Sequence, residues 1–214
     1  MKYKTKQYIF MGSALLSLCL FVAMLFMVKF GYQFQMDKLN TYFYNHQSKF
    51  ATNFFKFFTF FGEWWVLLLV GGLFTIYAKD KRIGTTCMTG TVVAVLLNLI
   101  FKFLVQRARP TTMLVSEVGY SFPSAHAMVS LAFYGLLIYF ANRKFDNLAC
   151  KIILTIVLSL IIALVGVSRI YLNVHYASDV LAGWLFGYVA LYFGKQLGKL
   201  LFKFKPAKQL VNQT

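Results

Sequence analysis

The stretch Ser168-Arg-Ile-Tyr-Leu-Asn-Val-His-Tyr-Ala-Ser-Asp179 lies between two apolar segments and carries three ionisable side chains, Arg169, His175 and Asp179. Ionisable groups are costly at membrane depth and usually serve a function there. On a helix, His175 and Asp179 would share one face, so the carboxylate could hold the imidazole. Such a pair supplies a nucleophile or base with its orienting partner, and the planar guanidinium of Arg169 suits phosphate oxygens. The stretch therefore indicates phosphate chemistry.

The composition is that of a membrane protein. The 214 residues are 59% hydrophobic and 13% charged, far more apolar than an ordinary soluble domain. The formal net charge of +16 could attract nucleic acid or anionic lipid. Because the basic residues stand at the ends of apolar runs, we interpret them as topology signals and lipid contacts, and we expect no nucleic-acid partner.

Six apolar runs predict an all-α bundle of six transmembrane helices, since about 20 apolar residues cross about 30 Å of hydrocarbon. The runs are 8–28, 64–78, 83–101, 125–141, 152–166 and 180–194. A cleaved signal peptide is the alternative for the first run, but that run is too long and lacks a small-residue cleavage site. No repeat, linker or second domain is evident, so residues 1–214 are predicted to form one domain.

Residues 31–61 are the least regular part, and isolated charges alternate there with dense aromatic residues. We interpret this segment as an outer loop with an interfacial aromatic belt. An ordinary membrane anchor and a surface that holds acyl or prenyl chains are both compatible with it.

The distribution of basic residues predicts the orientation. The amino terminus, the basic turns at 79–82 and 143–151 and the tail at 195–214 fall on one side and hold 14 of the 22 Lys and Arg residues. By the positive-inside rule this side, with both termini and the basic tail, is cytoplasmic. Every candidate site residue then faces the extracytoplasmic side.

A second block of candidate residues closes the third apolar run, where Lys102-Phe-Leu-Val-Gln-Arg-Ala-Arg109 precedes Pro110. A residue before proline is disfavoured in a helix, so the helix is predicted to end near Arg109. Lys102, Gln106 and Arg109 would then share one helical face. The alternative is that Lys102, Arg107 and Arg109 are snorkelling residues at the end of a span.

The third block, Phe122-Pro-Ser-Ala-His126, opens the fourth apolar run. Ser124 is a good N-cap, and the free N–H groups of a helix start, including that of Ala125, form a ready anion site. His126 can carry a proton near neutral pH and would reach a bound phosphate, although a lone histidine at a span mouth is often only a packing residue.

The three cysteines, Cys19, Cys87 and Cys150, lie in apolar segments without metal-ligand spacing. We interpret them as buried structural thiols and expect neither a disulfide framework nor a zinc site.

Lys-x6-Arg-Pro, Pro-Ser-x-His and Ser-Arg-x5-His-x3-Asp, in this order from Lys102 to Asp179, resemble the signature of the phosphatidic acid phosphatase type 2 superfamily. Bacterial acid phosphatases and vanadium haloperoxidases share this signature. The six-span layout resembles the bacterial membrane branch, the phosphatidylglycerophosphatase B and undecaprenyl-diphosphate phosphatase type. Ala125 departs from the pattern, which usually has glycine there.

The resemblance implies a metal-independent lipid phosphatase without cofactors. His175 would attack phosphorus to give a phosphohistidine, Asp179 would orient it, and His126 would protonate the leaving oxygen and then activate water. Five positions would bind the phosphate group: Lys102, Arg109, Ser124, Ala125 and Arg169.

The expected substrate is a membrane lipid with an anionic head, whose terminal phosphate is hydrolysed. Undecaprenyl diphosphate is the first candidate, and phosphatidylglycerophosphate and phosphatidic acid are the others. A catalytically impaired lipid-binding protein is a second class of function, to which Ala125 gives some weight. A transporter or channel is a third, but its charges should line a path through the bilayer, whereas here they gather at one side. The sequence leaves the oligomeric state open.

Overall fold

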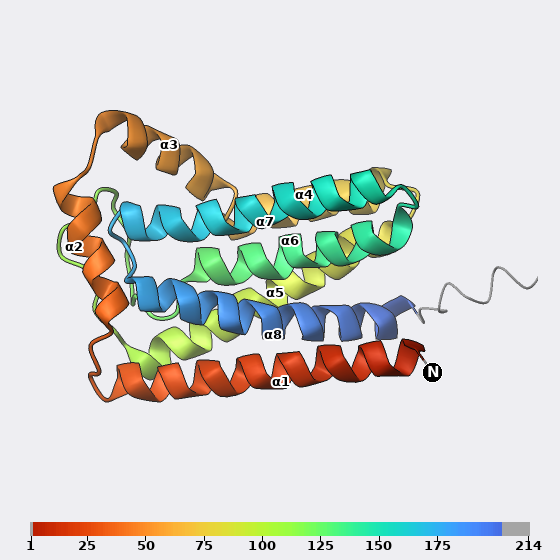
Figure 1. The fold of residues 1–214 in the computed structure, drawn as a ribbon, viewed down its shortest axis with the longest axis horizontal. Coiled ribbons are helices and arrows are strands. Elements are labelled where there is room, and N and C mark those ends of the chain that lie inside the picture. Colours follow the sequence, from red (N-terminus) through yellow and green to blue (C-terminus); the bar gives the residue numbers. More distant parts are fainter. Residues whose placement is uncertain (1, 203–214) are drawn as a thin grey trace, which may run out of the picture.

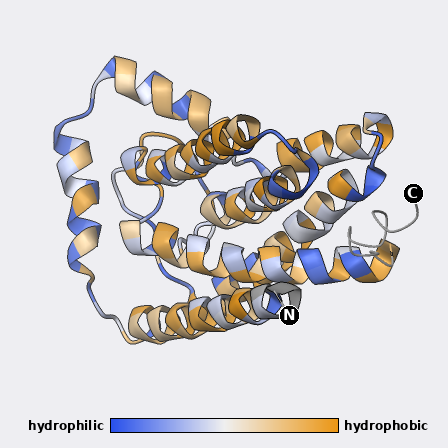
Figure 2. Cartoon of the chain, turned by 45° about the vertical axis from the view of Figure 1, so that its right-hand side comes forward, coloured by the Kyte–Doolittle hydropathy of each residue, from blue (hydrophilic) through white to orange (hydrophobic). Residues whose placement is uncertain are grey.

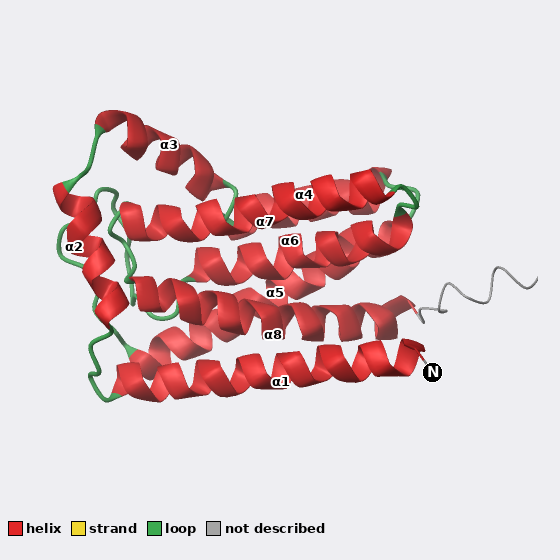
Figure 3. Cartoon of the chain, viewed as in Figure 1, coloured by secondary structure: helices red, strands yellow, loops and turns green. Residues whose placement is uncertain are grey.

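The computed structural model describes residues 2–202, and every regular element in this range is a helix (Figures 1 and 3). The elements are α1 (Lys2–Lys29), η1 (Gln35–Asp37), α2 (Lys38–Asn45), α3 (Lys49–Phe60), α4 (Trp64–Tyr77), α5 (Lys81–Val105), α6 (Ala125–Lys144), α7 (Leu148–Tyr171) and α8 (Ala177–Phe202). The predicted all-α fold is confirmed.

Five helices, α1, α5, α6, α7 and α8, are long and apolar enough to cross a membrane. α3 and α4 form a bent pair with an angle of 48°, and the number of spans is six if this pair counts as one. The predicted second span thus corresponds to α4, which has only 14 residues, together with the aromatic helix α3 that precedes it. The multi-pass architecture agrees with the sequence prediction.

The long helices lie side by side along the long axis of the molecule (Figure 1). The start of α1, the end of α8, the α4–α5 turn and the α6–α7 turn lie at one end. The opposite end carries α2, the loop 106–124 and the first residues of α6 and α8. The three blocks of candidate residues therefore meet at one end. Most of the predicted basic tail lies outside the described residues.

Among the five spanning helices, the buried fraction decreases as the mean hydropathy increases. α8 is the least apolar of the five spanning helices and the most buried, whereas α7 is the most apolar and the most exposed. Figure 2 shows hydrophobic residues along the helices of the bundle, and many large hydrophobic side chains of α1, α5 and α7 are exposed. This is the pattern expected when lipid rather than water surrounds a bundle, because the outward faces need no polar cover. Cys19 and Cys150 lie on exposed surface, so only Cys87 matches the prediction of buried thiols.

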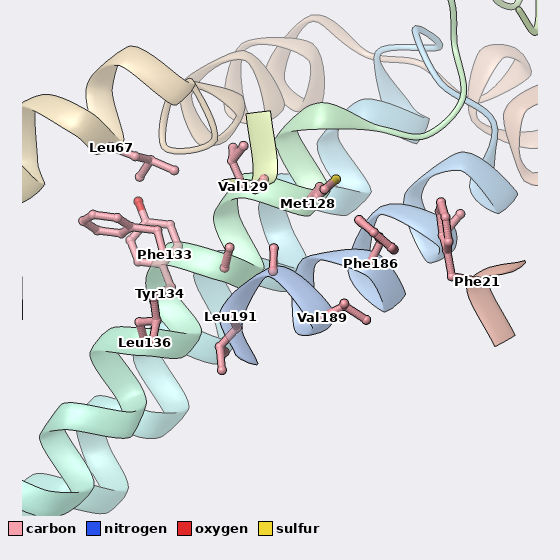
Figure 4. Close-up of a cluster of buried hydrophobic side chains, with 14 of the residues drawn as sticks. Phe21, Leu67, Met128, Val129, Phe133, Tyr134, Leu136, Phe186, Val189 and Leu191 are labelled. Carbon is pink, nitrogen blue, oxygen red and sulfur yellow. The ribbon is translucent and has the colours of Figure 1, made fainter. Parts of the chain in front are cut away.

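The interior is apolar where α6 and α8 meet. Phe133 and Leu136 of α6, Phe186 and Leu191 of α8 and Phe21 of α1 belong to one buried cluster (Figure 4). These side chains hold the helices that carry His126 and Asp179 against each other.

Two glycines on α8 set the distance between α8 and α6. A Cβ atom on Gly183 would lie 2.7 Å from the carbonyl oxygen of Ser124, and one on Gly187 would lie 2.6 Å from that of Met128. This small-xxx-small spacing lets two helix backbones touch. As a result the N–H of Ser124 donates to the carbonyl oxygen of Asp179 at 3.0 Å, which joins two of the candidate blocks.

Candidate active site

The end of α5 differs from the prediction. α5 ends at Val105 because Gln106 adopts a left-handed conformation with φ 55°, so the chain leaves the helix axis four residues before Pro110. The prediction of a helix to Arg109, with Lys102 and Arg109 on one helical face, was wrong. Lys102 stays on the last turn of α5, whereas Arg109 reaches the site from the loop.

Arg107 holds the carboxylate of Asp179. Its Nη1 lies 2.5 Å from Asp179 Oδ1, and its Nη2 lies 2.8 Å from Asp37 Oδ2. Asp37 also accepts hydrogen bonds from the N–H and the hydroxyl of Ser178. Burial opposes the charge on Arg107, but Asp179 and Asp37 together outweigh it and raise the pKa of Arg107 above its ordinary value. The interpretation of Arg107 as a snorkelling residue was wrong, because its guanidinium is paired inside the protein.

Asp179 is fully buried and has further partners on its other oxygen. Oδ2 accepts from the backbone N–H of Tyr176 at 2.9 Å and from the hydroxyl of Ser121. The first of these bonds closes the start of α8 in the manner of a capping box. His175 precedes α8, so the predicted shared helical face was wrong for this pair. The pair still meets, with Nδ1 of His175 3.6 Å from Oδ2 of Asp179.

His175 is buried, and its two ring nitrogens face different partners. Nε2 lies 3.2 Å from Nη1 of Arg109, which can only donate, so Nε2 accepts and the ring proton is on Nδ1. Burial lowers the pKa of His175 to about 3. The imidazole is therefore neutral at physiological pH, with its free electron pair directed toward Arg109.

The carboxylate of Glu117 bridges Arg109 and Arg169, the two arginines that were predicted to bind the phosphate group. Nη2 of Arg169 donates to Oε1 of Glu117, and Oε2 of the same side chain lies 3.7 Å from Nη2 of Arg109. Burial opposes ionisation of Glu117, but the Arg169 guanidinium lowers its pKa below the ordinary value. Nη1 of Arg169 also donates to the hydroxyl of Thr59 at 2.6 Å. We refer to Lys102, Arg109 and Arg169 as the basic cluster.

Nδ1 of His175 is one of the buried polar atoms that have no hydrogen-bond partner among the described residues. Two others are Nε of Arg169 and Oγ of Ser124, both on predicted phosphate ligands. Buried polar groups are rarely left unpaired, and those that are suggest a binding role. Ser124 occupies the predicted N-cap position of α6, but its side chain makes no capping bond. A phosphate oxygen is a suitable acceptor for both atoms.

His126 pairs with a residue that the sequence analysis did not identify. Its Nε2 lies 3.1 Å from Oε1 of Glu63, which stands in the turn between α3 and α4. His126 also lines a cavity of about 180 Å³ together with Lys102, Trp64, Leu99 and Val129. The cavity lies between α4, α5 and α6 and is largely apolar.

Arg107, Asp37, Ser121, Glu117 and Glu63 were not among the predicted site residues. One signal could have found the three carboxylates among them. The chain has only 6 acidic residues against 22 basic ones, so an acid placed in an apolar chain is an unusual feature. The partners of these acids depend on contacts between distant segments, which the spacing does not give.

The fold and the site define a class of protein. A helical membrane bundle holds a buried neutral histidine, a second histidine and a basic cluster at one end, and these groups are suited to phosphoryl chemistry. The profile of the PAP2 superfamily matches residues 84–202. The chain belongs to the PAP2 superfamily, as the motifs predicted.

Curated relatives and solved structures agree with this assignment. The chain is 35% identical over 112 residues to phosphatidylglycerophosphatase B of Bacillus subtilis, which covers 51% of this chain and 55% of that protein. It is 32% identical over 136 residues to an undecaprenyl-diphosphatase of Sulfolobus acidocaldarius, covering 59% and 61% of the two chains. The matched regions thus span little more than half the length of these relatives.

The fold resembles two solved structures. The crystal structure of a transmembrane PAP2 type phosphatidylglycerolphosphate phosphatase from Bacillus subtilis aligns with a TM-score of 0.75 at 22% identity, covering 90% of this chain and 99% of the other. Aquifex aeolicus LpxE aligns with a TM-score of 0.56 at 24% identity, covering 74% and 93%. These likenesses support the membrane fold.

Proposed function

We propose that the protein is an integral membrane lipid phosphatase that removes the terminal phosphate of a lipid phosphate or diphosphate through a phosphohistidine intermediate. The observation that carries the proposal is the setting of His175. Its ring is neutral, Nδ1 faces Asp179, and the electron pair on Nε2 faces Arg109 beside Arg169. A nucleophile with its orienting carboxylate on one side and phosphate ligands on the other is the arrangement that covalent phosphoryl transfer requires.

In the proposed reaction, Nε2 of His175 forms a bond to phosphorus as the bond to the leaving oxygen breaks. Asp179 keeps the proton on Nδ1 and stabilises the positive charge that develops on the ring. The basic cluster, Oγ of Ser124 and the N–H groups at the start of α6 would bind the phosphate oxygens. Groups fixed toward the charge of the transition state usually give the largest catalytic effect.

His126 would protonate the leaving oxygen and then accept a proton from the water that hydrolyses the phosphohistidine. General acid and base catalysis of this kind contributes about 10²- to 10⁴-fold in rate. The apolar cavity beside His126 supports this role, because the leaving oxygen is attached to a lipid chain and must lie near both groups.

The substrate would combine an anionic head with a chain that stays in the bilayer. Undecaprenyl diphosphate is our first candidate, and phosphatidylglycerophosphate and phosphatidic acid are the others. The printed names of the relatives, a phosphatidylglycerophosphatase and an undecaprenyl-diphosphatase, support the choice of these lipids.

We place the site on the extracytoplasmic side and both termini in the cytoplasm. The support is the positive-inside distribution of Lys and Arg together with the position of the site at the end of the bundle opposite the start of α1. Cysteine labelling from outside intact cells, with a cysteine at exposed Val118, tests this orientation.

Ala125 supports activity rather than a catalytically impaired protein. It is the first residue of α6 and has no positive φ, so its side chain causes no backbone strain where the family usually has glycine.

The proposal is tested with the purified full-length protein in detergent against the three lipids, by release of inorganic phosphate. We expect turnover of at least one lipid and a loss of at least 10³-fold in His175→Ala. Lipid binding without phosphate release would instead favour a binding protein.

A further inference from the structure

Within residues 2–202, the side chain of Glu63 makes one hydrogen bond, and its partner is His126. Oε1 lies 3.1 Å from Nε2 of the histidine. Glu63 stands at the N-cap position of α4, yet its side chain makes no capping bond there. A carboxylate at a helix start would ordinarily pair with the free N–H groups of that helix. The side chain of Glu63 instead pairs with His126, which belongs to another helix, α6.

The turn that carries Glu63 is fixed relative to His126. The hydroxyl of Tyr134, on the same helix as His126, donates to the carbonyl oxygen of Phe61 at 2.9 Å. A Cβ atom on Gly62 would lie 2.4 Å from Val165 and 3.1 Å from Cδ2 of His126. The turn therefore lies directly against the imidazole ring, and only glycine leaves room for that contact. This packing holds the carboxylate of Glu63 next to the imidazole of His126.

The surroundings of His126 give the carboxylate an electrostatic role. Lys102 lines the same cavity as His126, and Arg169 and Glu117 lie within electrostatic reach of it. Neighbouring cations disfavour a protonated imidazole, whereas an adjacent carboxylate favours it. A general acid must carry its proton before the leaving group departs. Glu63 is the negative charge in direct contact with this ring.

The contact also decides which nitrogen exchanges protons. The hydrogen bond a histidine makes through one nitrogen fixes the tautomer and leaves the other nitrogen for chemistry. Glu63 occupies Nε2, so Nδ1 is the nitrogen left for transfer. The ring atom of His126 nearest to Gly62 is Cδ2, and Nδ1 lies across the ring from Cδ2.

We propose that Glu63 is the positioning residue for His126 as general acid and base, an inference that rests on the proposed function. As the bond between phosphorus and the lipid oxygen breaks, that oxygen takes the electron pair and the proton from Nδ1, while Nε2–H stays on Glu63. In the second half, Nδ1 takes a proton from water as the water oxygen bonds to phosphorus. The bond between phosphorus and His175 then breaks.

The test uses Glu63→Gln, which keeps the size and hydrogen-bonding capacity of the side chain but removes its charge. A lipid monophosphate has an alkoxide leaving group that needs a proton, whereas p-nitrophenyl phosphate does not. We expect Glu63→Gln to lower kcat/KM on a lipid monophosphate by about 10- to 100-fold and to change kcat/KM on p-nitrophenyl phosphate by less than about 3-fold, because kcat/KM reports the steps up to departure of the leaving group. The alkaline limb of the lipid pH profile should move to lower pH.

Three comparisons give the inference its controls. His126→Ala should show the same dependence of kcat/KM on the leaving group, and the double variant should have a kcat/KM no lower than that of His126→Ala, because the two residues act as a unit. Asp146→Asn, which removes an exposed carboxylate at the opposite end, should match the wild type. Equal losses on both substrates, or losses that multiply in the double variant, would overturn the role of Glu63.

A failure of the proposed function can be distinguished from a failure of this inference. If the wild type releases no phosphate from any substrate, the proposed function fails. The contact itself can then be judged by NMR of protein with ¹⁵N-labelled histidine, using His126→Ala for assignment. The inference is supported if the ring of His126 loses its proton at a lower pH in Glu63→Gln than in the wild type. It is contradicted if the ring loses its proton at the same pH in both proteins.

Discussion

Arg107 Nη1 lies 2.5 Å from Asp179 Oδ1, and this ion pair joins the loop after α5 to the first turn of α8. Asp179 is fully buried, so its charge depends on this partner. Because Asp179 in turn faces His175, Arg107 supports the candidate nucleophile through Asp179.

Removal of Arg107 should therefore reduce both stability and activity. Loss of one partner of a buried ion pair destabilises a protein by about 3 to 5 kcal/mol, and the lower end is appropriate because the Arg107 side chain is 17% exposed. We expect Arg107→Ala to lower the thermal unfolding midpoint and to reduce kcat/KM by at least 10-fold. Arg82→Ala, at the opposite end, is the control. An Arg107→Ala protein with wild-type activity would show that Asp179 keeps its position without this partner.

Replacement of Glu117 should strengthen phosphate binding. Its carboxylate lies between Arg109 and Arg169, so it competes with a phosphate group for the same guanidinium donors. We expect Glu117→Gln to lower the inhibition constants of inorganic phosphate and vanadate by about 5- to 10-fold, equivalent to about 1 kcal/mol. Weaker inhibition would show that Glu117 holds the arginines in place rather than occupying the phosphate position.

A phosphohistidine should be trapped in the wild type. Acid-sensitive, alkali-stable label from a ³²P-labelled lipid phosphate should appear on the protein after rapid quenching. It should be absent in His175→Asn and should accumulate in His126→Ala, because water activation follows its formation. Label that remains in His175→Asn would assign the nucleophile to another residue.

The burial of His175 predicts a specific dependence of stability on pH. Its pKa falls from 6.5 in the unfolded chain to about 3 in the folded protein. Between these values the unfolded state binds the additional proton, so the contribution of His175 is complete above about pH 6.5 and is lost as the pH falls toward 3. The unfolding midpoint of the wild type should decrease over this range more steeply than that of His175→Asn, measured by thermal scans. Parallel profiles would contradict the assigned burial effect.

Gly183 should matter for the geometry of the site. A methyl group there would lie 2.7 Å from the carbonyl oxygen of Ser124, whereas one at Gly72 would meet nothing within 4 Å. We expect Gly183→Ala to reduce kcat/KM by at least 10-fold, since a displacement of about 1 Å can cost 10²-fold in rate. Gly72→Ala should retain wild-type activity. Unchanged activity in Gly183→Ala would mean that the start of α6 adapts without loss.

The sequence by itself determined the membrane bundle and the family to which the chain belongs. Long apolar runs must become helices in a bilayer, because a helix satisfies all its backbone groups internally. The spacing of Lys102, Arg109, Ser124, His126, Arg169, His175 and Asp179 matched the family signature without any coordinates.

Only the tertiary structure decided which groups pair. α5 ends at Val105, before Arg107 and Arg109, and His175 precedes α8, so helical spacing did not give their contacts. The partnerships of Arg107 with Asp179, Glu117 with Arg169 and Glu63 with His126 join residues 72, 52 and 63 positions apart. Local periodicity carries no information about such pairs. They form because the close packing of α6 and α8 leaves the buried charges at this end few partners other than one another.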